Sequence, residues 1–267
     1  MRFYEVLYLN NLTEKEKNAI KYYIGDVSGD DSFYGDGKAY VVLNSLFFPD
    51  IYSEKMRAGE GKLLNPAILE DVPRLLDFFN SLFSAFGKSV LEKSCRTYRV
   101  ERMGDFEIFR SKSRTISMTS TSLSGFLDAY RDRRGIALVE FNLCEGINCI
   151  DVSKALDNYV KAEETEILLP PFMEIDIQEK EMKSAERLIT DCDGNPPVIS
   201  TAVSVKGICS DICTSGIHIS DCKAGMRIYN ALNSNEIPDS EDIAEYSQWK
   251  RILRKLLYSI LYQYVVR

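Results

Sequence analysis

The sequence has very little histidine, and this scarcity limits the catalytic chemistry that it can support. Among its 267 residues only His218 carries an imidazole. A Ser-His-Asp or Cys-His hydrolase needs a histidine beside its nucleophile as the general base. Any site of that kind would have to use His218, so the composition leaves little room for this class of enzyme.

Long apolar runs are also missing. No stretch approaches the roughly 20 apolar residues that a membrane-spanning helix needs. The first residues, 1–5, lack the basic and then apolar pattern of a cleaved signal peptide. We therefore expect no transmembrane segment, and a protein that acts in the cytoplasm or is delivered by a route that needs no cleaved signal.

Basic residues are outnumbered, 33 against 40 acidic ones, and the net charge is −7. A general nucleic-acid binder would be basic, so we expect no nucleic-acid partner.

The seven cysteines are odd in number and the chain is no small disulfide-stapled domain, so reduced thiols are expected. Gly37-Lys38 lacks the upstream glycine and the following Ser or Thr of a phosphate loop, which excludes a nucleoside triphosphatase of that type.

The apolar pattern changes along the chain from helical to strand-like. Residues 13–16 have the spacing of a capping box, and the helix behind them has one apolar face. Further helices are predicted over 40–48, 71–87 and 239–265. Between these helices the period favours short strands, at 96–101, 106–110, 114–119, 136–142, 166–169 and 172–177. Helices followed by a group of strands predict an α+β fold.

Three short motifs follow one another in the strand-rich part. Arg99 lies in the first predicted strand, Ser120-Thr121-Ser122 follows the third, and Glu164-Thr165-Glu166 leads into a short apolar strand. Because side chains alternate along a strand, we expect Glu164 and Glu166 to project to the same side. Two carboxylates this close repel each other unless a positive charge or a ligand balances them.

In this order the motifs resemble those of the arginine–serine–glutamate (R-S-E) clade of mono-ADP-ribosyltransferases, a clade that contains many bacterial toxins. The resemblance implies the ADP-ribosyltransferase fold, a mixed β core of two packed sheets with helices before it. It implies a catalytic domain over 1–198, with a helical part over 1–90 and the β core over 91–198. Residues 199–267 would be a C-terminal, partly helical extension packed on the core.

The resemblance also implies an activity, the transfer of ADP-ribose from NAD, as substrate, to a protein acceptor with release of nicotinamide. Glu166 is implied to hydrogen-bond the nicotinamide ribose and to stabilise the oxocarbenium-like transition state. Glu164 is implied to orient the acceptor, and a glutamate there goes with an arginine acceptor. Ser120 is implied to hydrogen-bond the catalytic glutamate, and Ser120 and Thr121 belong to the NAD site.

Further residues are implied to contact NAD. Arg99 would hold the pyrophosphate with its fork of donors, with Arg96 as a rival. Arg134 would contact a phosphate. Tyr130 would stack on the nicotinamide; the family usually has Phe there, and Phe126 is an alternative. Residues 158–161 would form the loop, called the ARTT loop in this family, that recognises the protein acceptor.

Two alternatives stay open for the function and one for the C-terminal part. An NAD glycohydrolase would use the same residues with water as acceptor, and a non-catalytic binding module would keep only the fold. The C-terminal part also gathers the ligand types of structural zinc, namely Cys209, Cys213, His218 and Cys222. Their spacing differs from that of a zinc knuckle and isoleucines lie between them, so buried thiols are the stronger interpretation and zinc the weaker.

Overall fold

The computed structural model describes residues 6–8, 11–25, 40, 43–44, 46–47, 69–110, 114–115, 117–123, 134–157, 165–184, 186–208, 217–234 and 236–265. Contacts divide the chain into two compact units. The first comprises Met1–Leu12 and Phe86–Cys209, and the second comprises Thr13–Ala85 and Ser210–Arg267. Within the described ranges, no helix combines the length and the apolar character that crossing a membrane requires.

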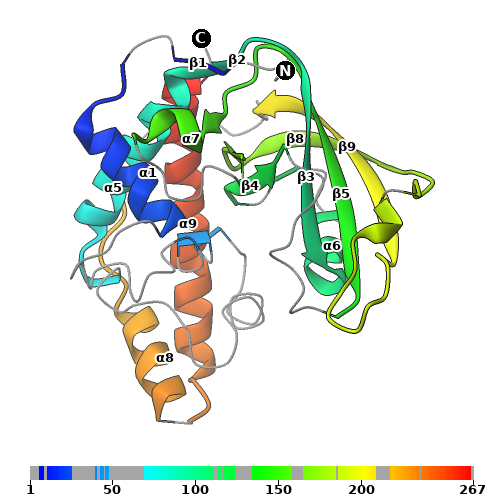
Figure 1. The fold of residues 1–267 in the computed structure, drawn as a ribbon. Coiled ribbons are helices and arrows are strands. Elements are labelled where there is room, and N and C mark those ends of the chain that lie inside the picture. Colours follow the sequence, from blue (N-terminus) through cyan, green and yellow to red (C-terminus); the bar gives the residue numbers. More distant parts are fainter. Residues whose placement is uncertain are drawn as a thin grey trace. The chain divides into compact units, whose positions relative to one another are not determined.

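The first unit is built on a mixed seven-stranded sheet (Figure 1). Its strands are β3 (Cys95–Arg102), β4 (Thr119–Ser122), β5 (Ile136–Leu143), β6 (Ile150–Asp151), β7 (Glu166–Leu169), β8 (Met173–Glu179) and β9 (Ile199–Ile208). Their order across the sheet is β6-β7-β4-β3-β5-β9-β8. Strands β5 and β9 are parallel, and the other neighbours are antiparallel.

Shorter elements complete the first unit. Strands β1 (Val6–Tyr8) and β2 (Ser89–Leu91) form a separate antiparallel pair. Helix α6 (Met103–Arg110) follows β3 directly, α7 (Val152–Ala155) follows β6, and a 3-10 turn, η3 (Glu186–Leu188), precedes β9.

Apolar side chains form a cluster on each face of the seven-stranded sheet. The larger cluster includes Val139 of β5, Ile167 of β7 and Val203 of β9, and Phe106 of α6 packs in it. A smaller cluster on the opposite face consists of Val100, Ile136 and Leu138, with Ile189 packed against it. Successive residues of β5 belong to the two clusters in turn, as expected for a strand that is buried on both sides.

The second unit is helical. It contains α1 (Glu14–Ile24), α5 (Val72–Gly87) up to Ala85, α8 (Lys223–Asn233) and α9 (Ser240–Val265), and α8 packs beside α9 (Figure 1). The predicted capping box is present at Thr13, whose hydroxyl accepts from the Glu16 N–H at 3.3 Å while the Glu16 carboxylate accepts from the Thr13 N–H at 2.7 Å.

The predicted α+β fold is confirmed, but one predicted strand is wrong. Residues 106–110 belong to helix α6. Met103 and Phe106 are three residues apart and both pack against the core of the sheet, with Phe106 fully buried. That spacing is helical, but Phe106, Glu107 and Ile108 alternate between apolar and polar residues, a pattern that also fits a strand.

The strand predicted over 114–119 is displaced. Strand β4 begins only at Thr119 and contains the serine motif, while Arg114 makes an isolated bridge to Glu174. The backbone of Thr115 bonds instead to Phe172 and Met173, which takes this segment out of the β4 ladder.

The domain boundary predicted at residue 198 remains a prediction, and the contacts group the chain differently. Residues 199–208 form β9, which pairs with β5 and β8 inside the sheet. The two units are each assembled from two separate stretches of chain, so a single cut after residue 198 does not separate them.

A buried ion network lies on the sheet face of the smaller cluster. The Lys180 ammonium donates to the carboxylates of Glu140 at 2.8 Å and Glu186 at 2.7 Å, and all three side chains are at most 17% exposed. Ser200 donates to Glu186 at 3.2 Å. Burial alone would raise the pKa of Glu186, but its hydrogen bonds to Lys180, to the Lys183 N–H and to Ser200 outweigh burial and lower it.

We predict that Lys180→Met destabilises the fold by about 3 kcal/mol, because it leaves two buried carboxylates without their cation. The lowered pKa of Glu186 means that its contribution is present above pH 4.5 and is lost as pH falls through the folded-state value. The deficit of the variant, measured by urea denaturation, should therefore shrink below about pH 4.5.

Lys15→Met is the matched control, since it removes an ion pair to Asp77 in which both side chains are more than half exposed. It should cost at most about 1 kcal/mol. A Lys180→Met deficit no larger than that of Lys15→Met would contradict a structural role for the network.

Candidate functional site

Three adjacent strands carry the three motifs that the sequence singles out. Arg99 lies in β3, Ser120 and Ser122 lie in β4, and Glu166 is the first residue of β7. These strands are neighbours in the order β7-β4-β3. Residues that are far apart in the sequence therefore meet in one part of the sheet.

The strand register places the serine and glutamate side chains on one face. Ser122 pairs with Glu166, and Ser120 pairs with Leu168 two positions further along. Since paired residues share a face and alternate residues return to it, Ser120, Ser122 and Glu166 project to the same side. Ser122 is the direct neighbour of Glu166, and Ser120 is a diagonal one.

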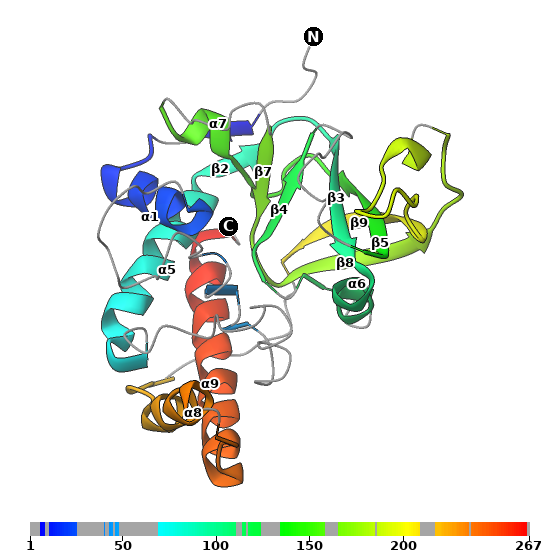
Figure 2. The same ribbon diagram turned by 60° about the horizontal axis from the view of Figure 1, so that its bottom comes forward.

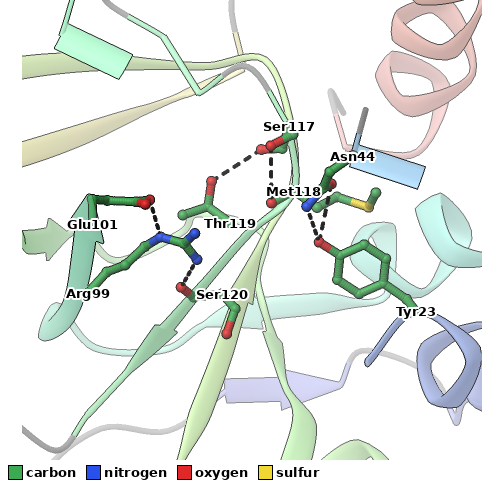
Figure 3. Close-up of polar contacts among 8 residues, drawn as sticks. All are labelled: Tyr23, Asn44, Arg99, Glu101, Ser117, Met118, Thr119 and Ser120. Carbon is green, nitrogen blue, oxygen red and sulfur yellow. Dashed lines mark hydrogen bonds and ion pairs between the residues drawn. The ribbon is translucent and has the colours of Figure 1, made fainter. Parts of the chain in front are cut away.

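Arg99 lies on the other side of the strands. Tyr98 pairs with Ser122, so Tyr98 shares the face of Glu166 and Arg99 projects to the opposite face. There the Arg99 Nε donates to the Glu101 carboxylate, and Nη1 donates to the backbone carbonyl of Ser120 at 2.8 Å (Figure 3). Arg99 therefore contacts the backbone of Ser120 and not its hydroxyl.

Strands β3 and β4 are joined by only one residue pair and then diverge (Figure 2). By contrast, β3 pairs with β5 over eight positions, and β4 pairs with β7 over all four of its residues. The Arg99 guanidinium, which donates to the Ser120 carbonyl, makes a further contact between the two strands. The candidate site thus lies where two continuous ladders of one sheet meet.

The chain enters β7 through an unusual backbone conformation. Thr165 has φ of 45°, a left-handed value that is rare for a β-branched residue. The Thr165 carbonyl accepts from the Leu123 N–H at 3.3 Å, and its hydroxyl lies 3.5 Å from that of Ser122. Regular strand geometry begins at Glu166. Glu164 lies outside the described residues, so the side predicted for it stays a prediction.

The other end of β7 is held by Thr115, which is fully buried. Its hydroxyl donates to the Pro170 carbonyl at 3.2 Å and accepts from the Met173 N–H at 2.9 Å. Phe172, in the turn between β7 and β8, has φ of 65°. Left-handed residues other than glycine therefore flank both ends of the strand that begins with Glu166, and such strain is often concentrated at functional sites.

Arg134 is exposed and lies beside the turn over 191–195. Its Nε is 3.1 Å from the Asp193 carboxylate. The neighbouring Asp191 carboxylate accepts from the N–H groups of Asn195, Gly135 and Asp193, and these hydrogen bonds lower its pKa. This turn fixes the start of β5 next to Arg134.

Several predicted site residues lie outside the described residues, namely Glu164, Tyr130, Phe126, the loop over 158–161, Cys209 and Cys213. His218 is exposed. Cys222 is buried at the N-terminus of α8, where its sulfur accepts from the Gly225 N–H at 3.4 Å, and burial raises its pKa to about 11. In the described part of the chain, no group of His, Cys, Asp and Glu side chains is arranged to hold a metal.

Sequence reasoning missed Glu101 as a partner of Arg99. The two residues are separated by one position in a strand, so they share a face. Opposite charges two positions apart in a predicted strand are a signal in the sequence that the two side chains contact each other.

No family model matches the sequence, and no curated protein matches it. Solved structures do match. The chain is 17% identical to Plx2a, an ADP-ribosyltransferase toxin from Paenibacillus larvae, with a TM-score of 0.45 over 73% of this chain and 87% of that chain. C3stau2 from S. aureus, solved with NAD, gives the same identity, TM-score and coverage.

BECa, an ADP-ribosylating toxin of a binary enterotoxin of C. perfringens solved with NADH, is also 17% identical. Its TM-score is 0.46, and the match covers 74% of this chain but only 45% of that longer chain. Similarity at this level does not by itself give this chain the activity of these toxins.

We predict that Thr115→Val destabilises the fold by about 2 kcal/mol or more, because it leaves the buried Met173 N–H and Pro170 carbonyl without their partner. Thr201→Val is the matched control. Thr201 is equally buried, and its hydroxyl has no hydrogen-bond partner among the described residues. Thr201→Val should lower the free energy of unfolding by no more than about 0.5 kcal/mol, and it can raise it. Equal losses of unfolding free energy in the two variants, measured by urea denaturation, would show that Thr115 does not hold the turn between β7 and β8.

Proposed function

We propose that this chain is an NAD-dependent mono-ADP-ribosyltransferase of the arginine–serine–glutamate type, with a protein arginine as acceptor. The observation that carries the proposal is the meeting of Arg99, the serine motif and Glu166 on three adjacent strands. The order of these motifs along the chain supports it. The ladders β6-β7-β4 and β3-β5-β9-β8 would correspond to the two sheets of that fold.

Glu166 is the proposed catalytic residue. Breaking the bond between nicotinamide and ribose leaves positive charge on the sugar, and a carboxylate beside it stabilises the transition state more than the ground state. Ser120 and Ser122 share its face and would restrict its position. The hydrogen bond from the Leu123 N–H to the Thr165 carbonyl would fix the backbone just before Glu166, and so the position of the Glu166 side chain.

Arg99 is the proposed pyrophosphate-binding residue, and Thr121 projects to the same face of the sheet. Because Arg99 and Glu166 project to opposite sides, one NAD molecule would have to lie where β3 and β4 part in order to reach both. An extended dinucleotide separates its pyrophosphate from its nicotinamide, which suits such a placement. Arg134 and Tyr130 would add contacts to a phosphate and to the nicotinamide.

Glu164 is the proposed acceptor-orienting residue. A carboxylate can hold a guanidinium through two hydrogen bonds and lower the cost of moving its proton. The loop over 158–161 would recognise the acceptor protein.

We predict that purified protein consumes NAD and that Glu166→Gln reduces kcat by about 10²- to 10³-fold, because an amide cannot offset the developing charge. The measurement is nicotinamide release with and without agmatine, a small guanidinium acceptor. Glu179→Gln is the control, since Glu179 is an exposed glutamate of β8 with a side chain 71% accessible. It should leave the rate unchanged.

The outcomes separate the candidate functions. Consumption that depends on Glu166 and rises with agmatine supports transfer to guanidinium groups. Consumption that ignores agmatine favours hydrolysis by water or a different acceptor residue. No consumption, with no change of melting temperature on adding NAD, would contradict the enzyme assignment and favour a non-catalytic binding module.

A further inference from the structure

Arg99 is held by two contacts that together fix its guanidinium plane. The Nε donates to the Glu101 carboxylate, and Nη1 donates to the Ser120 carbonyl at 2.8 Å (Figure 3). One contact comes from the same strand and the other from the neighbouring strand. A planar fork of donors binds a phosphate well only if that plane is already set, so these contacts bear directly on the role proposed for Arg99.

The contact with Glu101 differs from an ordinary surface ion pair. The side chains of Arg99 and Glu101 are only 21% and 12% exposed. Their register partners in β5 are Val139 and Ala137, which are both fully buried. A charge-assisted hydrogen bond in such partly dry surroundings is stronger and better ordered than one in water.

The exposed pair of Arg110 and Glu107 on α6 shows the contrast. Its side chains are 46% and 51% exposed, and the Arg110 Nε lies 3.4 Å from Glu107. Pairs of this kind contribute little and do not fix a side chain. The sequence contains both pairs within 12 residues, so one can serve as the control for the other.

We propose that Glu101 is the positioning residue for Arg99 and thereby sets the affinity of the site for the pyrophosphate of NAD. This inference rests on the proposed function. Glu101 acts through its oxygen, which accepts from Nε and prevents the guanidinium from rotating. Its negative charge works in the opposite direction, because a carboxylate near a phosphate repels it.

The two effects of Glu101 can be separated by substitution. Glu101→Gln keeps an oxygen that can accept from Nε and removes the charge. Glu101→Ala removes both. If Glu101 acts by positioning Arg99, Glu101→Gln should bind NAD as tightly as the wild type or more tightly. Glu101→Ala should bind NAD more weakly.

The test is the Kd for NAD, measured by calorimetry on the full chain, together with kcat and KM for nicotinamide release. Glu101→Ala should raise Kd and KM about tenfold, the scale of one charge-assisted hydrogen bond, with kcat within about twofold of wild type. Glu101→Gln should keep both constants at or below the wild-type values. Glu107→Ala should change neither constant.

A second readout does not depend on NAD. The Arg99 Nε–H resonance, assigned through its loss in Arg99→Lys, should exchange slowly with solvent in the wild type and in Glu101→Gln, and quickly in Glu101→Ala. A general loss of structure would also affect other amide resonances, which should remain unchanged.

The inference is overturned if Glu101→Gln is as weak as Glu101→Ala, or if Glu101→Ala binds NAD as tightly as the wild type. Wild-type protein that binds no NAD would overturn the proposed function instead. In that case, slow Nε–H exchange that is lost only in Glu101→Ala would still support Glu101 as the residue that fixes Arg99, and equal exchange in all variants would reject it.

Discussion

A backbone pair and the Arg99 side chain connect the two ladders of the central sheet. Strands β3 and β4 share only the pair of Tyr98 and Ser122, and the Arg99 guanidinium donates to the Ser120 carbonyl just beyond it. This junction brings the arginine and serine motifs together while the strands diverge. Glu166 depends on it as well, because Ser122 is its partner in the next strand.

The parts of the fold with a clear period could be predicted from the sequence. The helix over 71–87 and the strands over 96–101, 136–142 and 166–169 are present with boundaries within two residues of those expected. Each combines an unambiguous apolar pattern with a polar or glycine boundary. The presence of Glu166 at the start of a strand followed from the same pattern.

Other features depend on contacts that a single sequence does not reveal. The register between β3 and β4 places Arg99 on the face opposite to Glu166, and no local pattern in the sequence indicates that register. The left-handed Thr165 has no local signal, since a threonine rarely adopts φ above zero and tertiary hydrogen bonding holds it there. Strand β9 is absent from the strands predicted from the sequence. Its place in the sheet comes from parallel pairing with β5.

The most direct test of the account is a crystal structure of Glu166→Gln protein with NAD. The substitution should slow cleavage enough to keep the dinucleotide intact. The account predicts the nicotinamide ribose beside residue 166, on the face of Ser120 and Ser122, and the pyrophosphate at Arg99 where β3 and β4 part. NAD bound away from these three strands, or a pyrophosphate without contact to Arg99, would contradict it.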